Sequence, residues 1–262
     1  MNAAFDTYAA SYDTDFTYSQ VGKKQRERVW SLLAEGHIGE HPWNVLEVNC
    51  GTGEDAVHFA QLGHRITASD ISAEMVACAA SKSRTRGIQN ATFLQAGFHQ
   101  LGDLGGNAPF DLIFSNFGGL NCASPDEFSN FLQAACSLLK PGGSLIAVIM
   151  PRVCLWESFY YLLKRPAIAF RRLKDSTVAK IDETELNVFY YSPRQVARNA
   201  EQFFHSLKVA PIGFFLPPSY LEHFFKNKPA LLERLAKWES KLPPSSFLAS
   251  VSDHYYIHLV KK

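Results

Sequence analysis

The segment Val45-Leu-Glu-Val-Asn-Cys-Gly-Thr-Gly53 is the strongest indication of the fold of this chain. Its apolar beginning is typical of a buried strand, and its glycines are typical of a tight turn. The segment Glu54-Asp-Ala-Val-His-Phe-Ala60 follows and indicates the beginning of a helix. Glycines in such a turn let the backbone approach a ligand closely, and the helix end offers free N–H groups. The stretch therefore predicts a strand–turn–helix ligand site on a parallel sheet.

The next predicted strand, Arg65–Ser69, runs into Asp70. An acid at the end of a second strand, about 20 residues after a glycine turn, is placed to accept both hydroxyls of a ribose. The two strands therefore indicate a cofactor that contains a nucleoside. The dinucleotide pattern G-x-G-x-x-G is incomplete, because Ala56 stands three places after Gly53. This disfavours a nucleotide-dependent oxidoreductase, which stays a competing hypothesis.

Three acids surround the same turn, Glu47 before it and Glu54 and Asp55 after it. Carboxylates gathered there would repel a pyrophosphate, whereas they would attract a cationic ammonium or sulfonium group. The turn is therefore better suited to a cofactor that carries a positive charge.

Four motifs of the chain resemble those of class I S-adenosylmethionine (SAM)-dependent methyltransferases. They are Val45–Gly53, Asp70-Ile-Ser-Ala-Glu-Met75, Phe110-Asp-Leu-Ile-Phe-Ser-Asn116 and Leu138-Leu-Lys-Pro-Gly-Gly-Ser-Leu145. They follow one another in the family's order. An unrelated α/β domain with a chance loop is the alternative, and four motifs in register disfavour it. Less specific motifs at 191–194, 215–222 and 253–256 are similar to those of a bacterial group within the superfamily.

The resemblance implies an α/β fold with a Rossmann-like seven-stranded sheet. In this fold the last strand is antiparallel, helices lie on both faces, and a lid is inserted. We expect one methyltransferase domain over 1–262, with an N-terminal helical cap at 1–40 and a substrate lid at 151–192. The predicted strands are 44–48, 65–69, 91–95, 110–115, 144–150, 206–214 and 253–260. The predicted helices are 21–36, 55–62, 73–83, 125–139, 194–204 and 217–241, and 176–189 indicates strand or loop.

Composition limits the classes of function. The net charge of +1 argues against a general nucleic-acid binder. Five cysteines without C-x-x-C spacing indicate a reducing compartment and no metal site. The N-terminus lacks the apolar region of a signal peptide, and no apolar stretch is long enough to span a bilayer. We therefore expect a cytoplasmic bacterial protein without stable membrane insertion.

The resemblance also implies which residues hold SAM, with S-adenosylhomocysteine as the product. The residues that it implies are Tyr12, Glu47, Asn49, Cys50, Gly51, Gly53, Asp70, Ile71, Met75, Gly97, Phe98, Asn116 and Phe117. Glu47 and the glycine turn would hold the methionine end, Asp70 the ribose, and Asn116 with Phe117 the sulfonium side. Ile71 and the pair Gly97–Phe98 would border the adenine.

Two positions depart from the family pattern. Asn49 stands where a glycine is usual, although asparagine tolerates left-handed backbone angles better than most residues. Gly97 stands where an acid commonly contacts the adenine amino group. These departures support an alternative hypothesis, a regulator or scaffold that binds SAM without turnover.

At the N-terminus, Phe5, Tyr8 and Tyr12 recur at helical spacing and share one face. We expect Phe5 to pack in the core. For Tyr12 two alternatives are open, packing in the core or a position over the bound cofactor. Lys23, Lys24, Arg26 and Arg28 are predicted on a solvated helix face, and His64 in a surface turn.

The acceptor is predicted from weaker signals. Asn121, Trp156, Tyr160 and Tyr191 are candidate substrate contacts, although Asn116 and Asn121 would equally serve to tie their loop. An aromatic lid and a phenylalanine-rich tail favour a small apolar or aromatic acceptor. The basic cluster Arg165, Arg171 and Arg172 indicates either a solvated helix face, an acidic group or a membrane surface. No catalytic residue is assigned among the possible bases, which are His99, His205, His223, His254 and Asp253.

Overall fold

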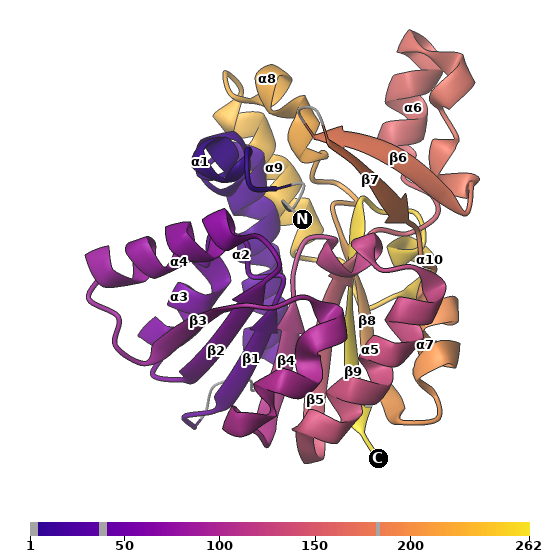
Figure 1. Cartoon of the computed structure of the whole chain (residues 1–262). Coiled ribbons are helices and arrows are strands. Elements are labelled where there is room, and N and C mark those ends of the chain that lie inside the picture. The colour runs from indigo at the N-terminus through magenta and orange to yellow at the C-terminus, as the bar shows by residue number, and fades with distance from the viewer. Residues whose placement is uncertain (1–4, 37–40, 182–183) are drawn as a thin grey trace.

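The centre of the molecule is one seven-stranded sheet (Figure 1). The computed structural model describes residues 5–36, 41–181 and 184–262. The strands lie in the order β3-β2-β1-β4-β5-β9-β8, and β9 runs antiparallel to both neighbours. Their bounds are β1 Asn44–Val48, β2 Arg65–Asp70, β3 Ala91–Gln95, β4 Phe110–Ser115, β5 Leu139–Ile149, β8 Phe204–Ile212 and β9 His254–Lys261. The predicted seven-stranded α/β fold with an antiparallel last strand is confirmed.

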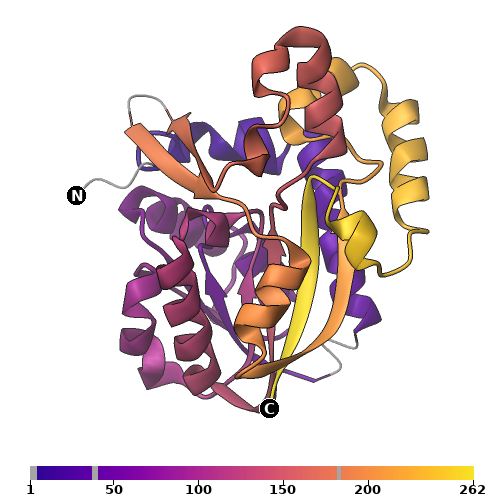
Figure 2. The ribbon, with the colours of Figure 1, turned by 90° about the vertical axis from the view of Figure 1, so that its right-hand side faces the viewer.

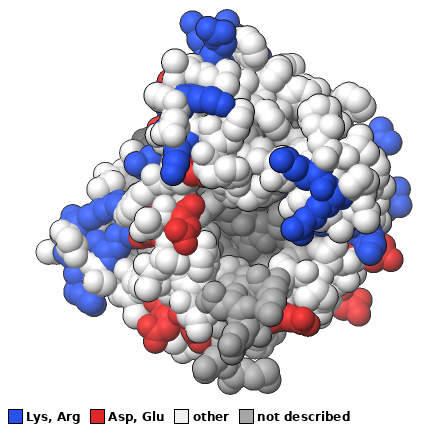
Figure 3. All heavy atoms as spheres, turned by 90° about the horizontal axis from the view of Figure 1, so that it is seen from above, with Lys and Arg blue, Asp and Glu red and all other residues white. Residues whose placement is uncertain are grey.

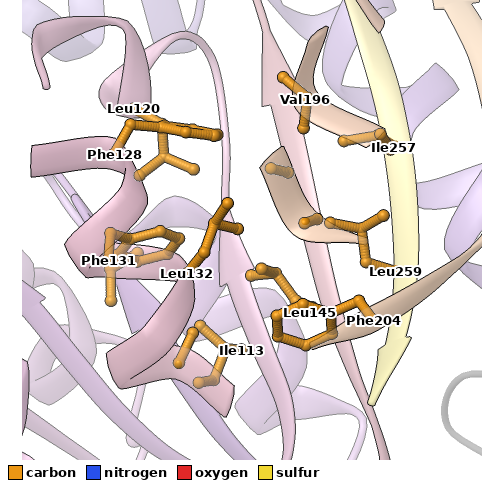
Figure 4. Packing of buried hydrophobic residues seen from close by; sticks show 14 of the residues in the cluster. Ile113, Leu120, Phe128, Phe131, Leu132, Leu145, Val196, Phe204, Ile257 and Leu259 are labelled. Carbon is orange, nitrogen blue, oxygen red and sulfur yellow. The ribbon is translucent and has the colours of Figure 1, made fainter. Parts of the chain in front are cut away.

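Helices cover both faces of this sheet. One face carries α2 Gln20–Glu35, α3 Glu54–Gln61 and α4 Ala73–Thr85, and the other carries α5 Pro125–Leu138, α7 Pro193–Ala200 and α10 Ser246–Ala249. Successive strand residues point to opposite faces, so Leu112 packs below α2 and α3 while Ile113 packs below α5. Figure 4 shows the second of these cores, where Phe128 and Phe131 of α5 meet the strands.

Serine side chains fix the beginnings of several helices. Ser72 accepts a hydrogen bond from the backbone N–H of Met75 at 3.1 Å, and Ser124 forms a capping box with Glu127. Such caps satisfy backbone N–H groups that a helix leaves without partners. They place the first turns of α4 and α5 at the same edge of the sheet.

A second layer of chain lies beyond the carboxyl ends of the parallel strands, at the top of Figures 1 and 2. It contains α1 Ala9–Tyr12 with the π-helical turn Asp13–Thr17, α6 Leu155–Lys164, and α8 Glu222–Phe225. It also contains the antiparallel pair β6 Ser176–Ile181 and β7 Thr184–Phe189, within a segment for which the sequence indicates strand or loop. The parts of the expected cap and lid that the structure describes therefore lie on one side of the sheet.

The predicted helix over 217–241 is wrong, because the chain forms two helices there. α8 ends at Phe225, and α9 spans Pro229–Glu239. Lys228 has φ −132° and ψ 53° between them, since a residue before proline avoids the helical conformation. The predicted strand 206–214 is likewise displaced, because Gly213 has φ +76° and ends β8 at Ile212.

Three predicted surface residues are buried. Arg26 and Arg28 lie in α2. Arg26 is buried against Asp55 of α3, and Arg28 donates a hydrogen bond to the Leu242 carbonyl at 3.4 Å. His64 is also buried, and its Nδ1 accepts a hydrogen bond from the backbone N–H of Trp43 at 3.1 Å. Burial lowers the pKa of His64. These corrections share one cause: local spacing does not reveal which distant element covers a helix or a turn.

Candidate functional site

Most residues predicted to hold the cofactor line one cavity of about 350 Å³. It lies at the carboxyl ends of β1, β2 and β4, and its size falls within the range of about 300–1,000 Å³ that is usual for small-molecule sites. The predicted residues that line it are Tyr12, Asn49, Gly51, Asp70, Ile71, Met75, Gly97, Phe98, Asn116 and Phe117. They come from segments far apart in the chain, so the fold assembles them.

A smaller cavity of about 30 Å³ adjoins the first, and Glu47 and Cys50 line it. Gly53 lines neither cavity. Its φ is +75°, and a Cβ there would lie 2.7 Å from the Cβ of Ala79. The glycine therefore allows the turn and its contact with α4, and the structure gives it a packing role beside the site.

The Asp70 carboxylate is held by the backbone at the end of β2. One oxygen accepts a hydrogen bond from the N–H of Gly51 and the other from that of Ser72, both at 2.9 Å. The side chain is buried, and burial raises its pKa. Each carboxylate oxygen has a second lone pair, so both remain able to accept hydroxyl groups from the cavity.

Asn49 adopts φ 56°, in the left-handed region that its predicted place in the turn requires. Its side chain donates a hydrogen bond to the Ser115 hydroxyl at 3.2 Å. A Cβ on Gly119 would lie 2.6 Å from the Cβ and Nδ2 of Asn49. The bulk that distinguishes Asn49 from a glycine is therefore accommodated by the absence of a side chain at Gly119.

Phe117 also has a left-handed backbone, with φ 45°. Its ring is held from three sides, at 5.1 Å from the Phe16 ring, 5.7 Å from the His254 ring and 4.9 Å from the Arg26 guanidinium. Such backbone strain persists where the surroundings fix the residue. The contacts therefore fix the Phe117 ring at the wall of the cavity.

Arg26, which the sequence interpretation placed in solvent, reaches the smaller cavity. It forms a buried ion pair with Asp55, which also accepts hydrogen bonds from Trp30 at 2.7 Å and Asn116 at 3.0 Å. The Nε atom of Arg26 and the Oε2 atom of Glu47 are buried without a hydrogen-bond partner. A ligand with polar groups at this end would satisfy atoms that the described residues leave unpaired.

The charge state of Glu47 depends on that environment. Burial raises its pKa well above the usual range, and the nearby Asp55 carboxylate acts in the same direction. An arriving cation would favour the ionised form, because an opposite charge nearby lowers the pKa of a carboxyl. Glu47 is therefore suited to receive a cationic group in the smaller cavity.

Side-chain contacts fasten the N-terminal segment over this site. Asp13 pairs with Lys82 of α4 at 2.8 Å and accepts a hydrogen bond from the Thr52 hydroxyl at 2.6 Å. Closer to the N-terminus, the Ser72 hydroxyl donates to Asp6 at 2.5 Å. The Tyr12 ring thereby lies next to Gly51, with its Cε1 4.0 Å from the position of a Cβ on that glycine.

The larger cavity is also lined by side chains that were not among the predicted cofactor or substrate contacts. Phe5 lines it, which corrects the expected core position, and His99, Glu127 and Leu186 line it as well. A Cβ on Gly97 would lie 3.1 Å from the His99 ring. The departure at Gly97 thus makes room for the imidazole, and Phe5 had no sequence signal beyond its helical spacing.

Two predicted substrate contacts are structural residues. Asn121 is buried, and its side chain ties the backbone of Met150 at 3.1 Å to that of Phe189 at 2.6 Å. Tyr191 is buried as well, and its hydroxyl donates to the Ala123 carbonyl at 2.6 Å. The expected contact of these two side chains with a substrate is therefore corrected, because packing in the fold already uses them.

The other two candidates, Trp156 and Tyr160, belong to α6 and line neither cavity. Trp156 donates a hydrogen bond to the Phe214 carbonyl at 3.0 Å, and the Tyr160 ring lies 5.9 Å from that of Tyr220. Their ring neighbours are Phe225 and Tyr220, and their contact with an acceptor stays a prediction.

His254 and Asp253, two of the unassigned candidates, form a hydrogen-bonded pair. Their Nδ1 and Oδ2 atoms are 3.2 Å apart, and the Nε2 atom lies 3.7 Å from the position of a Cβ on Gly118. Burial acts to raise the pKa of Asp253, but His254 and the Arg172 guanidinium together lower it. The dyad thus directs one imidazole nitrogen toward Gly118, which lines the larger cavity.

The Cys122 thiol is not poised as a nucleophile. Cys122 lines the larger cavity, and burial raises its pKa to about 11, so the reactive thiolate is disfavoured. Within 5–36, 41–181 and 184–262, no group of three or more His, Cys, Asp or Glu side chains is arranged to hold a metal ion. None of the helices described is both long and apolar enough to cross a membrane.

In comparisons with known proteins, residues 45–143 match the family model described as "Methyltransferase domain". The tRNA 5-carboxymethoxyuridine methyltransferase of Escherichia coli (strain K12) is 27% identical over 54% of this chain and 54% of its own length. A ubiquinone biosynthesis O-methyltransferase of Xanthomonas euvesicatoria is 32% identical over 41% of this chain and 43% of its own. The chain therefore spans about half the length of the curated relatives that it matches.

The fold extends further than the sequence similarity. The crystal structure of an S-adenosylmethionine-dependent methyltransferase from Clostridium acetobutylicum ATCC 824 superimposes with a TM-score of 0.61. That likeness covers 98% of this chain and 99% of the other at 16% identity. At this identity the likeness concerns the fold, and together with the family match it confirms the resemblance carried by the four motifs.

Proposed function

We propose that this chain transfers a methyl group from SAM to a small apolar or aromatic acceptor. The match to the methyltransferase domain at 45–143 and the class I SAM-dependent methyltransferase fold support this proposal. The observation that carries the proposal is the cavity at Asp70, Gly51 and Asn116, because three of the four sequence motifs contribute residues to its lining. S-adenosylhomocysteine would be the second product.

The two ends of the site have different chemistry, and both fit SAM. In the smaller cavity, Arg26 would hold the carboxylate of the methionine part and Glu47 its ammonium group. These are the residues whose buried Nε and Oε2 atoms have no partner among the described residues. In the larger cavity, Asp70 would accept the ribose hydroxyls, while Ile71 and Phe98 would enclose the adenine.

Bound SAM supplies a methyl carbon on a sulfonium, which an acceptor atom displaces in line. The chain's own contribution is orientation and the exclusion of water. Phe117 and Tyr12 wall the cavity with aromatic rings, and such rings attract a cation by their electron-rich faces. Asp13, held by Lys82 and Thr52, would keep the N-terminal segment closed over that space.

Some acceptors must lose a proton before or during the transfer. We assign His254 as the base for such an acceptor, because its Nε2 faces Gly118 while Asp253 holds Nδ1. A carboxylate on Nδ1 fixes the tautomer in which Nε2 is free to accept a proton. Asp253 acts here as a positioning residue.

The lining of the cavity supports a small acceptor. Phe5, Phe98, Phe117 and Leu186 contribute apolar surface, and Glu127 contributes a negative charge that a phosphate backbone would meet unfavourably. The E. coli relative is named as a tRNA methyltransferase, so transfer to RNA is the outcome that an experiment has to separate.

Incubation with methyl-labelled SAM tests the proposal. Parallel reactions contain a small-molecule extract and total tRNA from the same cells, and label is followed in each fraction. We expect label in the small-molecule extract. The Asp70→Ala variant should transfer no label, and its binding free energy for SAM should be weaker by roughly 1.5–3 kcal/mol. Label in tRNA would show that the acceptor is RNA and not a small molecule. Tight SAM binding without a labelled product would favour the scaffold hypothesis. Absence of SAM binding, with NADH binding instead, would overturn the proposal as a whole.

A further inference from the structure

Helix α6 turns an apolar stripe outward. Leu155, Phe159, Leu162 and Leu163 recur at intervals of four, three and one, which places them on one side of a helix. Phe159 is 65% exposed and Leu163 is 69% exposed. A surface helix ordinarily turns such a stripe toward the core, so its exposure indicates a surface for interaction.

The opposite side of α6 is the side that the fold holds. Glu157 is buried and accepts hydrogen bonds from Arg171 at 2.7 Å and from Arg172 at 3.0 Å. Arg172 in turn binds Asp253 at 2.9 Å. Because rotation of α6 would break these buried ion pairs, the apolar stripe stays directed outward.

The exposed surface continues past the helix end. Phe170 is 58% exposed and Leu173 is 52% exposed. We name the following six residues the α6 face: Leu155, Phe159, Leu162, Leu163, Phe170 and Leu173.

Basic side chains accompany the α6 face. Lys164, Arg165 and Lys174 are exposed, and among the described residues none has an ion-pair partner. The exposed acid Asp175 is paired with Arg152 at 3.3 Å. Seen from above in Figure 3, Lys and Arg side chains lie on the right, the side of α6 in Figure 1, as well as on the left and at the top. The surface is therefore both apolar and positive.

We propose that the α6 face docks on a lipid bilayer whose surface carries anionic headgroups. The apolar side chains would enter the boundary between headgroups and acyl chains, while Lys164, Arg165 and Lys174 would meet the anionic groups. A second copy of the chain fits less well, because a two-fold contact would bring these unpaired cations of both copies together. The charge of the patch therefore favours lipid over self-association.

Docking through the α6 face would place the bilayer near the cavity. In both views of the ribbon, α6 lies beyond the carboxyl ends of the parallel strands, the same end of the sheet at which the residues that line the cavity lie. A bilayer on the α6 face would bring apolar molecules dissolved in it close to that end. The docking itself does not depend on the proposed methyl transfer, and its test requires no turnover.

Flotation of the full-length protein with vesicles tests the proposal. We expect binding to vesicles of phosphatidylcholine with phosphatidylglycerol and little binding to phosphatidylcholine alone. The double variant Phe159→Ser, Leu163→Ser should lower the bound fraction by about tenfold or more, because it removes two apolar anchors. Lys164→Glu with Arg165→Glu should abolish the preference for anionic vesicles.

Matched controls come from elsewhere on the surface. Phe247 and Leu207 are 76% and 67% exposed, and Phe247→Ser with Leu207→Ser should leave binding unchanged. In addition, Phe159→Trp should gain fluorescence that brominated acyl chains quench. Absence of binding to anionic vesicles, or equal loss in the control variant, overturns the proposal. A wild-type dimer that dissociates in the Phe159→Ser, Leu163→Ser variant would instead assign the face to a second copy.

Discussion

The side chain of Asn49 fills the space that a side chain on Gly119 would need: a Cβ on Gly119 would lie 2.6 Å from the Asn49 Cβ. The two residues follow different strands, β1 and β4, and both line the larger cavity. An asparagine in a turn that ordinarily carries glycine therefore has a complementary glycine across the site. This relationship removes much of the reason to regard the turn as degenerate.

The pair predicts a coupled response to mutation. Gly119→Ala should weaken SAM binding and lower the unfolding free energy by roughly 1–3 kcal/mol, because the methyl group overlaps Asn49. Asn49→Gly should restore both quantities when it is combined with Gly119→Ala. Calorimetry and thermal unfolding of the two single variants and the double variant measure the coupling. Additive effects would show that the two side chains do not compete for space.

Arg26 should discriminate between ligands with and without the amino-acid end. Arg26→Lys keeps the charge beside Asp55 but loses the planar guanidinium, so we expect S-adenosylhomocysteine to bind about tenfold more weakly. Methylthioadenosine, which lacks the carboxylate, should bind with unchanged affinity and serves as the control ligand. Equal losses for both ligands would place the effect of Arg26 in the folding of the site.

Removal of the proposed base should depend on the acceptor. His254→Gln should lower kcat by about a hundredfold or more for an acceptor that must lose a proton. The loss should shrink for analogues whose acceptor group has a lower pKa, because they ionise without assistance. SAM affinity, measured by calorimetry, should change far less than kcat. A uniform loss across such a series would contradict proton transfer to His254.

Stability should fall in mild acid because of His258. Burial lowers its pKa to about 4, with Lys208 acting in the same direction, and its Nε2 lies 2.8 Å from the Ser144 hydroxyl. The ordinary pKa of histidine is about 6.5. Between about pH 6.5 and pH 4, His258 is therefore protonated in the unfolded chain and neutral in the folded chain. The unfolding free energy should decrease as the pH falls through this window, by at most about 3 kcal/mol.

Denaturant unfolding across that pH range measures this effect, with His258→Gln as the variant. Its stability should change less between the two pH limits than that of the wild type. His205→Gln, at an exposed position on the neighbouring strand β8, is the matched control and should keep the wild-type slope. If His258→Gln retains the full slope, other groups carry the acid sensitivity.

Much of the fold was predictable because its signals are local. The apolar residues and following glycines of Val45–Gly53 predict a strand and a turn, and Asp70 ends the next strand at the expected distance. The parallel sheet then brings the ends of β1, β2 and β4 to one edge. Asn49 in the left-handed region was likewise predictable, since its place in the turn requires that conformation.

The residues alone thus predicted a parallel sheet and the edge at which the cavity lies, while the resemblance to class I methyltransferases implied the seven strands and the antiparallel last one. Only the tertiary structure decided that Arg26 is buried against Asp55, that Gly119 makes room for Asn49, and that Tyr191 and Asn121 support the fold. It also decided that the stripe of α6 faces outward, although its spacing is typical of a core helix. The physical reason is that periodicity and turn residues report backbone conformation and polarity along the chain. Which side chain meets which depends on packing between segments that the sequence keeps far apart.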